Sequence, residues 1–278
     1  MRLETRKLEK AVAGLTSFLH ENSKHPTPDH VHHLRTSIRR LEAAVEICRF
    51  KPSHQERKLL RHLGCVRHRA GKIRDMDVMT VAAISMRIPT SQQEELVVLL
   101  HYLGAKRHMH AKRLHSIIRK RGINIIRGVT GLSSRLRKLA RSRPNKAEGS
   151  AIENTRRLLR ELEEPSTLTS EKLHAYRLKV KKIRDIIQLR KHAPSSFIEE
   201  LGKVSSAIGD WHDWKELLSI AKELSGQKTA LTRKVETITA NRCKRALSSA
   251  LRMRRKYFPL RDGKLSFSAL RVNSALES

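Results

Sequence analysis

Apolar residues recur three and four positions apart along nearly the whole chain, whereas alternating runs of Val, Ile, Thr and aromatic residues are almost absent. This spacing brings apolar side chains to one face of an α-helix, and the abundant Leu, Ala, Arg, Lys and Glu favour helix. The pattern therefore predicts an all-α protein. The expected helices cover residues 3–20, 28–48, 53–70, 76–87, 91–121, 122–140, 150–163, 170–192, 195–208, 213–225 and 229–257.

The two halves of the chain repeat one ordered pattern. The first half reads His32-x-x-Arg35-x-x-x-Arg39-Arg40, then Leu63-Gly64-x-Val66, Gly71 and Arg74-Asp75. The second half reads His174-x-x-Arg177-x-x-x-Lys181-Lys182, then Leu201-Gly202-x-Val204, Gly209 and His212-Asp213. Because Gly, Asp and His match in the same order, the pattern indicates a single domain over 1–278 built from two repeats. These cover about 1–145 and 150–260, with a hinge at 142–150 and a tail at 261–278.

Each repeat begins with a helix that carries a basic stripe. Positions i, i+3 and i+7 share one face of a helix, so His32, Arg35 and Arg39 project together. The matched residues of the second repeat do the same. Apolar residues form a neighbouring stripe, which predicts that the basic stripe lines a groove between helices. A single basic helix is typical of a solvated surface, but the same residue types at the same offsets in both repeats favour a ligand.

The net charge indicates what that ligand is. Lys and Arg number 59 against 27 Asp and Glu, which gives a formal charge of +32 before any His is protonated. Such a charge favours a densely negative partner: nucleic acid, an acidic membrane surface or inorganic polyphosphate. Arg binds two phosphate oxygens through its planar fork, Lys adds a point charge, and His gains a proton when an anion arrives. The stripes therefore suit phosphate groups.

Arg74-Asp75 and His212-Asp213 occupy equivalent positions in the two repeats. One interpretation is that each Asp caps the following helix and orients its basic neighbour. The other interpretation adds Arg74 to the groove, with Lys72 and His212 as weaker candidates.

The first repeat, quoted from residues 32–40 and 63–78, resembles the CHAD family, which is named for a conserved histidine α-helical domain. The second repeat is similar to that family's second half. The resemblance implies two helical bundles related by internal pseudo-twofold symmetry, a basic groove between them that binds inorganic polyphosphate, and no catalytic activity. The contacts that it implies are His32, Arg35, Arg39, Arg40, Arg74, His174, Arg177, Lys181 and Lys182, and Arg184 continues the second stripe.

Other functions find less support in the chain. Aromatic residues make up 4%, so stacking platforms for single-stranded nucleic acid are scarce, although nonspecific binding at low salt is expected of so basic a protein. A scaffold that recruits an acidic protein is the other alternative. No metal or cofactor is expected, because neither a P-loop nor a catalytic motif occurs and the candidate acids lie among basic residues. These acids are Asp75, Asp77, Asp210 and Asp213.

The three cysteines lie far apart, without Cys-x-x-Cys spacing, which indicates reduced thiols. The N-terminus has no apolar signal-peptide core, and no run of about 18 apolar residues occurs, so neither export nor a membrane partner is expected. We therefore expect a cytoplasmic protein, associated with polyphosphate granules if polyphosphate is the ligand.

Overall fold

The computed structural model describes residues 4–48, 51–89, 93–142, 157–162, 167–189, 195–227, 229–258, 260–261 and 264–265. Its helices are α1 (Thr5–Glu21), α2 (Pro28–Ile47), α3 (His54–Ile84), α4 (Gln93–Ser142), α6 (Ser170–Gln188), α7 (Ser195–Ser225) and α8 (Ala230–Tyr257). Residues 157–162 are also helical, and two short strands, β1 (Leu260–Arg261) and β2 (Lys264–Leu265), pair antiparallel. The predicted all-α class is confirmed. Within the described ranges, no helix is long and apolar enough to cross a membrane. Nearly all of the predicted hinge and of the tail lies outside the described residues.

Three helices are longer than the sequence predicts. α3 joins the expected helices 53–70 and 76–87, α7 joins 195–208 and 213–225, and α4 joins 91–121 and 122–140. The predicted gaps at 71–75 and 209–212, which begin at Gly71 and Gly209, are wrong. Glycine costs a helix interior only about 1 kcal/mol, which the packing of flanking buried residues outweighs. Asp75 and Asp213 consequently lie inside continuous helices, so the interpretation of them as N-caps is wrong too.

The two stripe-bearing helices, α2 and α6, begin differently. Thr27 precedes α2, and its side chain accepts a hydrogen bond from the backbone N–H of His30, with Pro28 as the first helical residue. Thr169 precedes α6 in extended backbone, but its side chain makes no capping bond. Both repeats therefore begin their stripe helix at a threonine, and the first repeat uses the hydroxyl as a cap.

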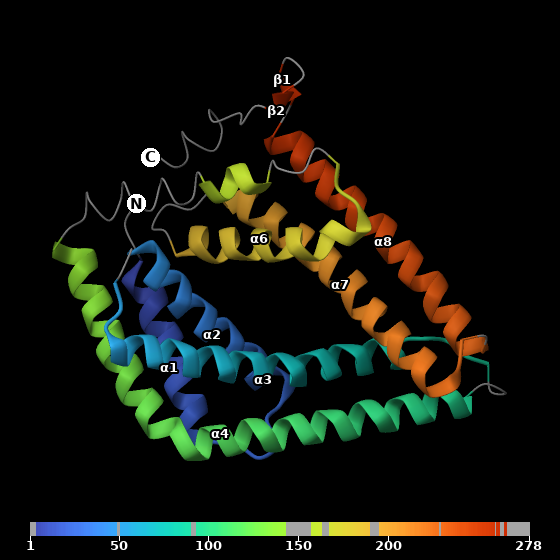
Figure 1. Cartoon of the computed structure of the whole chain (residues 1–278), viewed down its shortest axis with the longest axis horizontal. Coiled ribbons are helices and arrows are strands. Elements are labelled where there is room, and N and C mark those ends of the chain that lie inside the picture. Colours follow the sequence, from blue (N-terminus) through green and yellow to red (C-terminus); the bar gives the residue numbers. More distant parts are fainter. Residues whose placement is uncertain are drawn as a thin grey trace.

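Figure 1 shows two groups of helices, α1–α4 toward the lower left and α6–α8 toward the upper right of the view. α3 packs along α4, and α7 along α8, while α2 contacts α6 and α3 contacts α7 across the groups. One hydrophobic core runs through both groups, and a second joins them where Met76 and Met79 meet Trp214 and Leu217. The stripe-bearing helices are therefore held against each other by a shared core.

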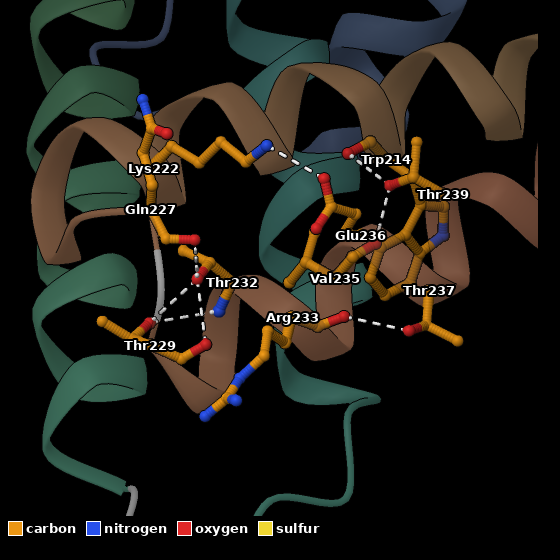
Figure 2. A network of polar contacts seen from close by, with 10 residues as sticks. All are labelled: Trp214, Lys222, Gln227, Thr229, Thr232, Arg233, Val235, Glu236, Thr237 and Thr239. Carbon is orange, nitrogen blue, oxygen red and sulfur yellow. Dashed lines mark hydrogen bonds and ion pairs between the residues drawn. The ribbon is translucent and has the colours of Figure 1, made fainter.

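A polar network fixes α7 to the start of α8 (Figure 2). Thr229 caps α8 by accepting a hydrogen bond from the backbone N–H of Thr232 at 3.2 Å. The hydroxyl of Thr239 in α8 donates to the carbonyl oxygen of Trp214 in α7 at 3.3 Å. The bond from Thr239 holds α8 to the stretch of α7 that carries the predicted site residue His212.

Candidate functional site

Four cationic side chains from the two stripes meet where α2 contacts α6. Arg35 and Arg39 come from α2, and Arg177 and Lys181 come from α6. All four side chains are partly buried. The positive charges of Arg35 and Arg177 repel each other across the two helices. Burial, together with the positive charges of its three neighbours, lowers the pKa of Lys181 to about 7. We call these four residues the inner cluster, and its cations come from both repeats.

The guanidinium groups of Arg35 and Arg177 each lie against a glycine of a neighbouring helix, Gly71 of α3 and Gly209 of α7. A Cβ added to Gly71 of α3 would lie 3.7 Å from Nη2 of Arg35, an ordinary contact. A Cβ added to Gly209 of α7 would lie 3.0 Å from Cζ of Arg177 and closer still to a terminal nitrogen, so Arg177 would have to move. Arg177 also donates from Nε to the carbonyl oxygen of Ser205 at 3.3 Å. The close approach of an arginine therefore depends on glycine at Gly209, whereas Gly71 leaves room for a Cβ.

Two carboxylates lie beside the inner cluster. Asp75 of α3 interacts with Arg35 and Arg177. Asp213 of α7 interacts with Arg177 and Lys181. Burial raises the pKa of Asp213 to about 6, although Arg177 acts in the opposite direction. Two more acids act on the cluster: Asp185 on Arg39 and Lys181, and Glu42 on Arg39. Both are also shared with basic residues outside the cluster, Asp185 with Arg40 and Arg184 and Glu42 with Arg67. Cations therefore still outnumber acids in this partly buried place.

The other two candidate metal-binding acids of the sequence, Asp77 and Asp210, each pair with an arginine. Asp77 accepts a hydrogen bond from Arg107 at 2.6 Å, and Asp210 pairs with Arg242 at 2.7 Å. Among the residues that the structure describes, no three His, Cys, Asp or Glu side chains are placed to hold one metal ion.

Histidines occupy one end of the inner cluster, which we call the histidine end. The ring centroids of His174 and His212 lie 4.6 Å apart, between α6 and α7. Burial lowers the pKa of His32, and the charge of nearby Arg74 lowers it further. His32 and His174 are exposed, whereas Arg74 and His212 are partly buried. Each repeat therefore presents an exposed histidine and a second basic residue at this end.

Ion pairs lie at the other end, which we call the acidic end after Glu42 and Glu46 of α2. Lys182 of α6 pairs with Glu46 at 2.8 Å, and Arg67 of α3 pairs with Glu42 at 3.1 Å. These residues and Lys181 line a pocket of about 210 Å³. Lys182 thus has an ion pair with a single carboxylate, whereas Lys181 shares Asp213 and Asp185 with other basic residues.

The three remaining residues predicted from the sequence, Arg40, Arg184 and Lys72, also lie outside the inner cluster. Arg40 interacts with Asp185 near the acidic end, and Arg184 packs against α7. Lys72 is exposed on α3, and its positive charge acts on His110 of α4. Lys72 therefore belongs to the side of α3 that faces α4.

The sequence did not single out Arg67, which reaches the acidic end from α3. It lies seven residues before Arg74 and so shares that residue's helix face, and this spacing is the signal that could have found it. Counted back from the repeated glycine, the matching residue of the second repeat is Ser205, whose carbonyl oxygen binds Arg177. The two repeats therefore surround the same stripe with different partners.

Comparisons with known proteins agree with this architecture. The sequence profile of the CHAD domain matches residues 6–222. The crystal structure of the CHAD domain from the plant Ricinus communis is similar to this chain with a TM-score of 0.58 and 15% sequence identity, over 98% of this chain and 89% of that one. No curated protein sequence matches the chain. At this identity, the likeness to the plant structure shows a shared fold.

Proposed function

This chain belongs to the CHAD domain family, and we propose that its inner cluster binds inorganic polyphosphate, a linear polyanion, without catalysing a reaction. The inner cluster carries the proposal, because cations from both repeats lie together there, partly buried and with an excess of positive charge. Such crowding raises the energy of the free protein unless an anion fills the site.

Lys181 is the residue at which this repulsion is clearest. With a pKa of about 7, it gives up much of its charge at neutral pH in the free protein. A phosphate chain beside Lys181 would restore the proton, because nearby negative charge favours the ammonium form. Binding then replaces mutual repulsion with charge-assisted hydrogen bonds, which are stronger than those between neutral groups.

The surroundings of the inner cluster favour a ligand without bulky side groups. Its cations lie between α2 and α6, with α3 and α7 packed alongside. Polyphosphate carries charge on every unit and no base, so it fits a partly buried place that a strand with bases does not. The chain enters at the exposed histidine end, since Arg67 and Lys182 at the acidic end are already paired with carboxylates.

A salt titration checks the electrostatic character of binding. If the chain contacts roughly eight to ten phosphates, log K should fall against log salt concentration with a slope of about −6 to −7, taking the coefficient for single strands. A slope near zero would exclude a mechanism based on charge neutralisation.

The deciding experiment is a competition titration in which labelled long-chain polyphosphate is displaced by unlabelled polyphosphate, single-stranded RNA or duplex DNA. It compares the native chain with Arg35→Ala/Arg177→Ala and with a control, Arg252→Ala/Arg255→Ala, which removes the same charge from the exposed surface of α8. We expect polyphosphate to compete at least about tenfold better than either nucleic acid. The inner-cluster variant should lose that preference while it stays helical, and the control should keep it. If both variants lost the same amount of polyphosphate affinity, binding would depend only on net charge, and the proposal would be overturned.

A further inference from the structure

A second basic site lies on the opposite side of α3. The beginning of α3 and the middle of α4 border an open pocket of about 1010 Å³. Because a helix turns about 100° per residue, the lining residues Lys58 and His62 project from the side of α3 away from Arg67 and Arg74. The pocket is therefore separate from the inner cluster.

The rim of this pocket is cationic. Besides Arg135, four exposed cations line it: Lys58, Lys120, Arg121 and Arg127. None of these four forms an ion pair with a residue that the structure describes. Glu56, the acid of the lining, is already engaged, because it accepts a hydrogen bond from the backbone N–H of Ser53 and pairs with Arg135 at 2.7 Å. The rim therefore offers unneutralised positive charge to an anion.

The floor of the pocket is apolar and open. Leu59 and Leu132 are buried beneath it, and a Cβ added to Gly128 would touch Leu59 at 3.0 Å. At Gly131 an added Cβ would meet nothing within 4 Å, so the backbone of α4 borders open space there. The exposed amide of Asn124 adds a hydrogen-bond donor and an acceptor. A flat polar ring fits this floor, whereas a bare phosphate chain makes no use of it.

The basic surface continues along α4 beyond the pocket. Lys106, Arg113, Lys120 and Arg127 recur every seven residues and so form one stripe of about 30 Å on the helix. Burial lowers the pKa of His110, and the charges of Arg113, Lys72, Arg69 and Lys106 lower it further, which shows that α3 adds cations to the same surface. An elongated anion suits this stripe better than a compact one.

We propose that this α3–α4 face, meaning the pocket and the α4 stripe, binds single-stranded nucleic acid. The backbone phosphates lie along the stripe, and one unstacked base enters the pocket. There the base packs on Leu59 and on an arginine plane and forms hydrogen bonds with Asn124. This site is additional to polyphosphate binding at the inner cluster and does not depend on it.

Filling the pocket tests the proposal without changing charge. Gly131→Leu places a side chain in the open space of the pocket, and Gly104→Leu, at an equally open and exposed glycine of α4, is the control. The probes are labelled single-stranded RNA, single-stranded DNA of the same sequence and long-chain polyphosphate, each titrated against the full chain. We expect Gly131→Leu to weaken binding of both strands by about tenfold, the order of one lost base contact, and to leave polyphosphate binding unchanged.

A second pair of variants separates the stripe from net charge. Arg113→Gln/Lys120→Gln/Arg127→Gln is compared with Lys244→Gln/Arg252→Gln/Arg255→Gln, which removes the same charge from exposed positions of α8. The stripe variant should bind single-stranded RNA at least about tenfold more weakly than the α8 variant. Equal RNA losses in the two variants, or unchanged strand binding in Gly131→Leu, would overturn the proposal. A selective loss of polyphosphate binding in the stripe variant would also overturn it. Failure of the inner-cluster variants leaves these outcomes unaffected.

Discussion

The two repeats build the inner cluster from matched positions but give it different properties. The first repeat contributes two arginines, which stay charged throughout the physiological pH range. The second repeat contributes Arg177 and Lys181, and the pKa of about 7 lets Lys181 lose its proton. Arg177 also packs more tightly against Gly209 than Arg35 packs against Gly71. The first repeat therefore supplies side chains of constant charge. The second supplies a tightly packed arginine, Arg177, and a lysine, Lys181, whose charge changes with pH.

Removing one guanidinium group from each repeat gives the largest expected effect. Arg35→Ala and Arg177→Ala each delete charge-assisted hydrogen bonds worth about 1.5–3 kcal/mol, so each should weaken polyphosphate binding at least about tenfold. The loss should be larger for Arg35→Ala at pH 7.5. Removal of Arg177 relieves the main repulsion on Lys181, which then regains part of its charge.

Titrations at pH 7.5 and pH 6 measure this difference. At pH 6 Lys181 is already protonated in the native chain, so the gap between the two variants should close. A larger loss for Arg177→Ala at both pH values would contradict the assignment of Lys181 as the compensating group.

Alanine at each repeated glycine tests the packing difference. Gly209→Ala displaces Arg177, so polyphosphate affinity should fall by about tenfold, the value of one charge-assisted hydrogen bond. Gly71→Ala leaves Arg35 at an ordinary contact distance, so affinity should not change, and stability should rise by about 0.5–1 kcal/mol because alanine favours helix. Calorimetric titration and urea unfolding measure the two quantities. Equal affinities in the two variants would mean that Arg177 does not touch the ligand.

Replacing Lys181 by arginine should remove one step of the pH dependence. Bound phosphate favours the protonated amine, so in the native chain affinity should rise as the pH falls from 8 to 7, where Lys181 regains its proton. Between pH 8 and pH 7 the protonated fraction of Lys181 rises from about one in eleven to about one half, so the rise in affinity over this range is about fivefold. Lys181→Arg should bind with constant affinity between pH 8 and pH 7.

The remaining pH dependence below pH 7 provides the internal control. Protonation of Asp213, with its pKa of about 6, removes a negative charge from the site, and protonation of His32 adds a positive one, so affinity should rise in both proteins. Binding isotherms at constant ionic strength check both ranges. If Lys181→Arg followed the native curve between pH 8 and pH 7, another group would titrate there.

The helical class and the repeated stripe were predictable because both depend on spacing within one helix, which no tertiary contact alters. The counter-charges were not, since Glu46 reaches Lys182 only through the packing of α2 on α6. The unbroken course of α7 was missed for a related reason. The low helix propensity of glycine predicts a break at Gly209. In the fold, however, Gly209 makes room for Arg177, a residue of another helix.

The smallest expected effect separates the neighbours Lys181 and Lys182. Lys182 pairs with Glu46 at 2.8 Å, and because the side chains are 44% and 30% exposed, the pair is worth about 1 kcal/mol or less. Glu46→Gln should lower the free energy of unfolding in urea by up to that amount and change polyphosphate affinity by less than about twofold. An affinity that rose about tenfold would mean that freed Lys182 binds phosphate and that the ligand passes through the acidic end. An unchanged affinity would mean that the bound phosphate chain contacts the inner cluster as far as Lys181 and does not reach Lys182.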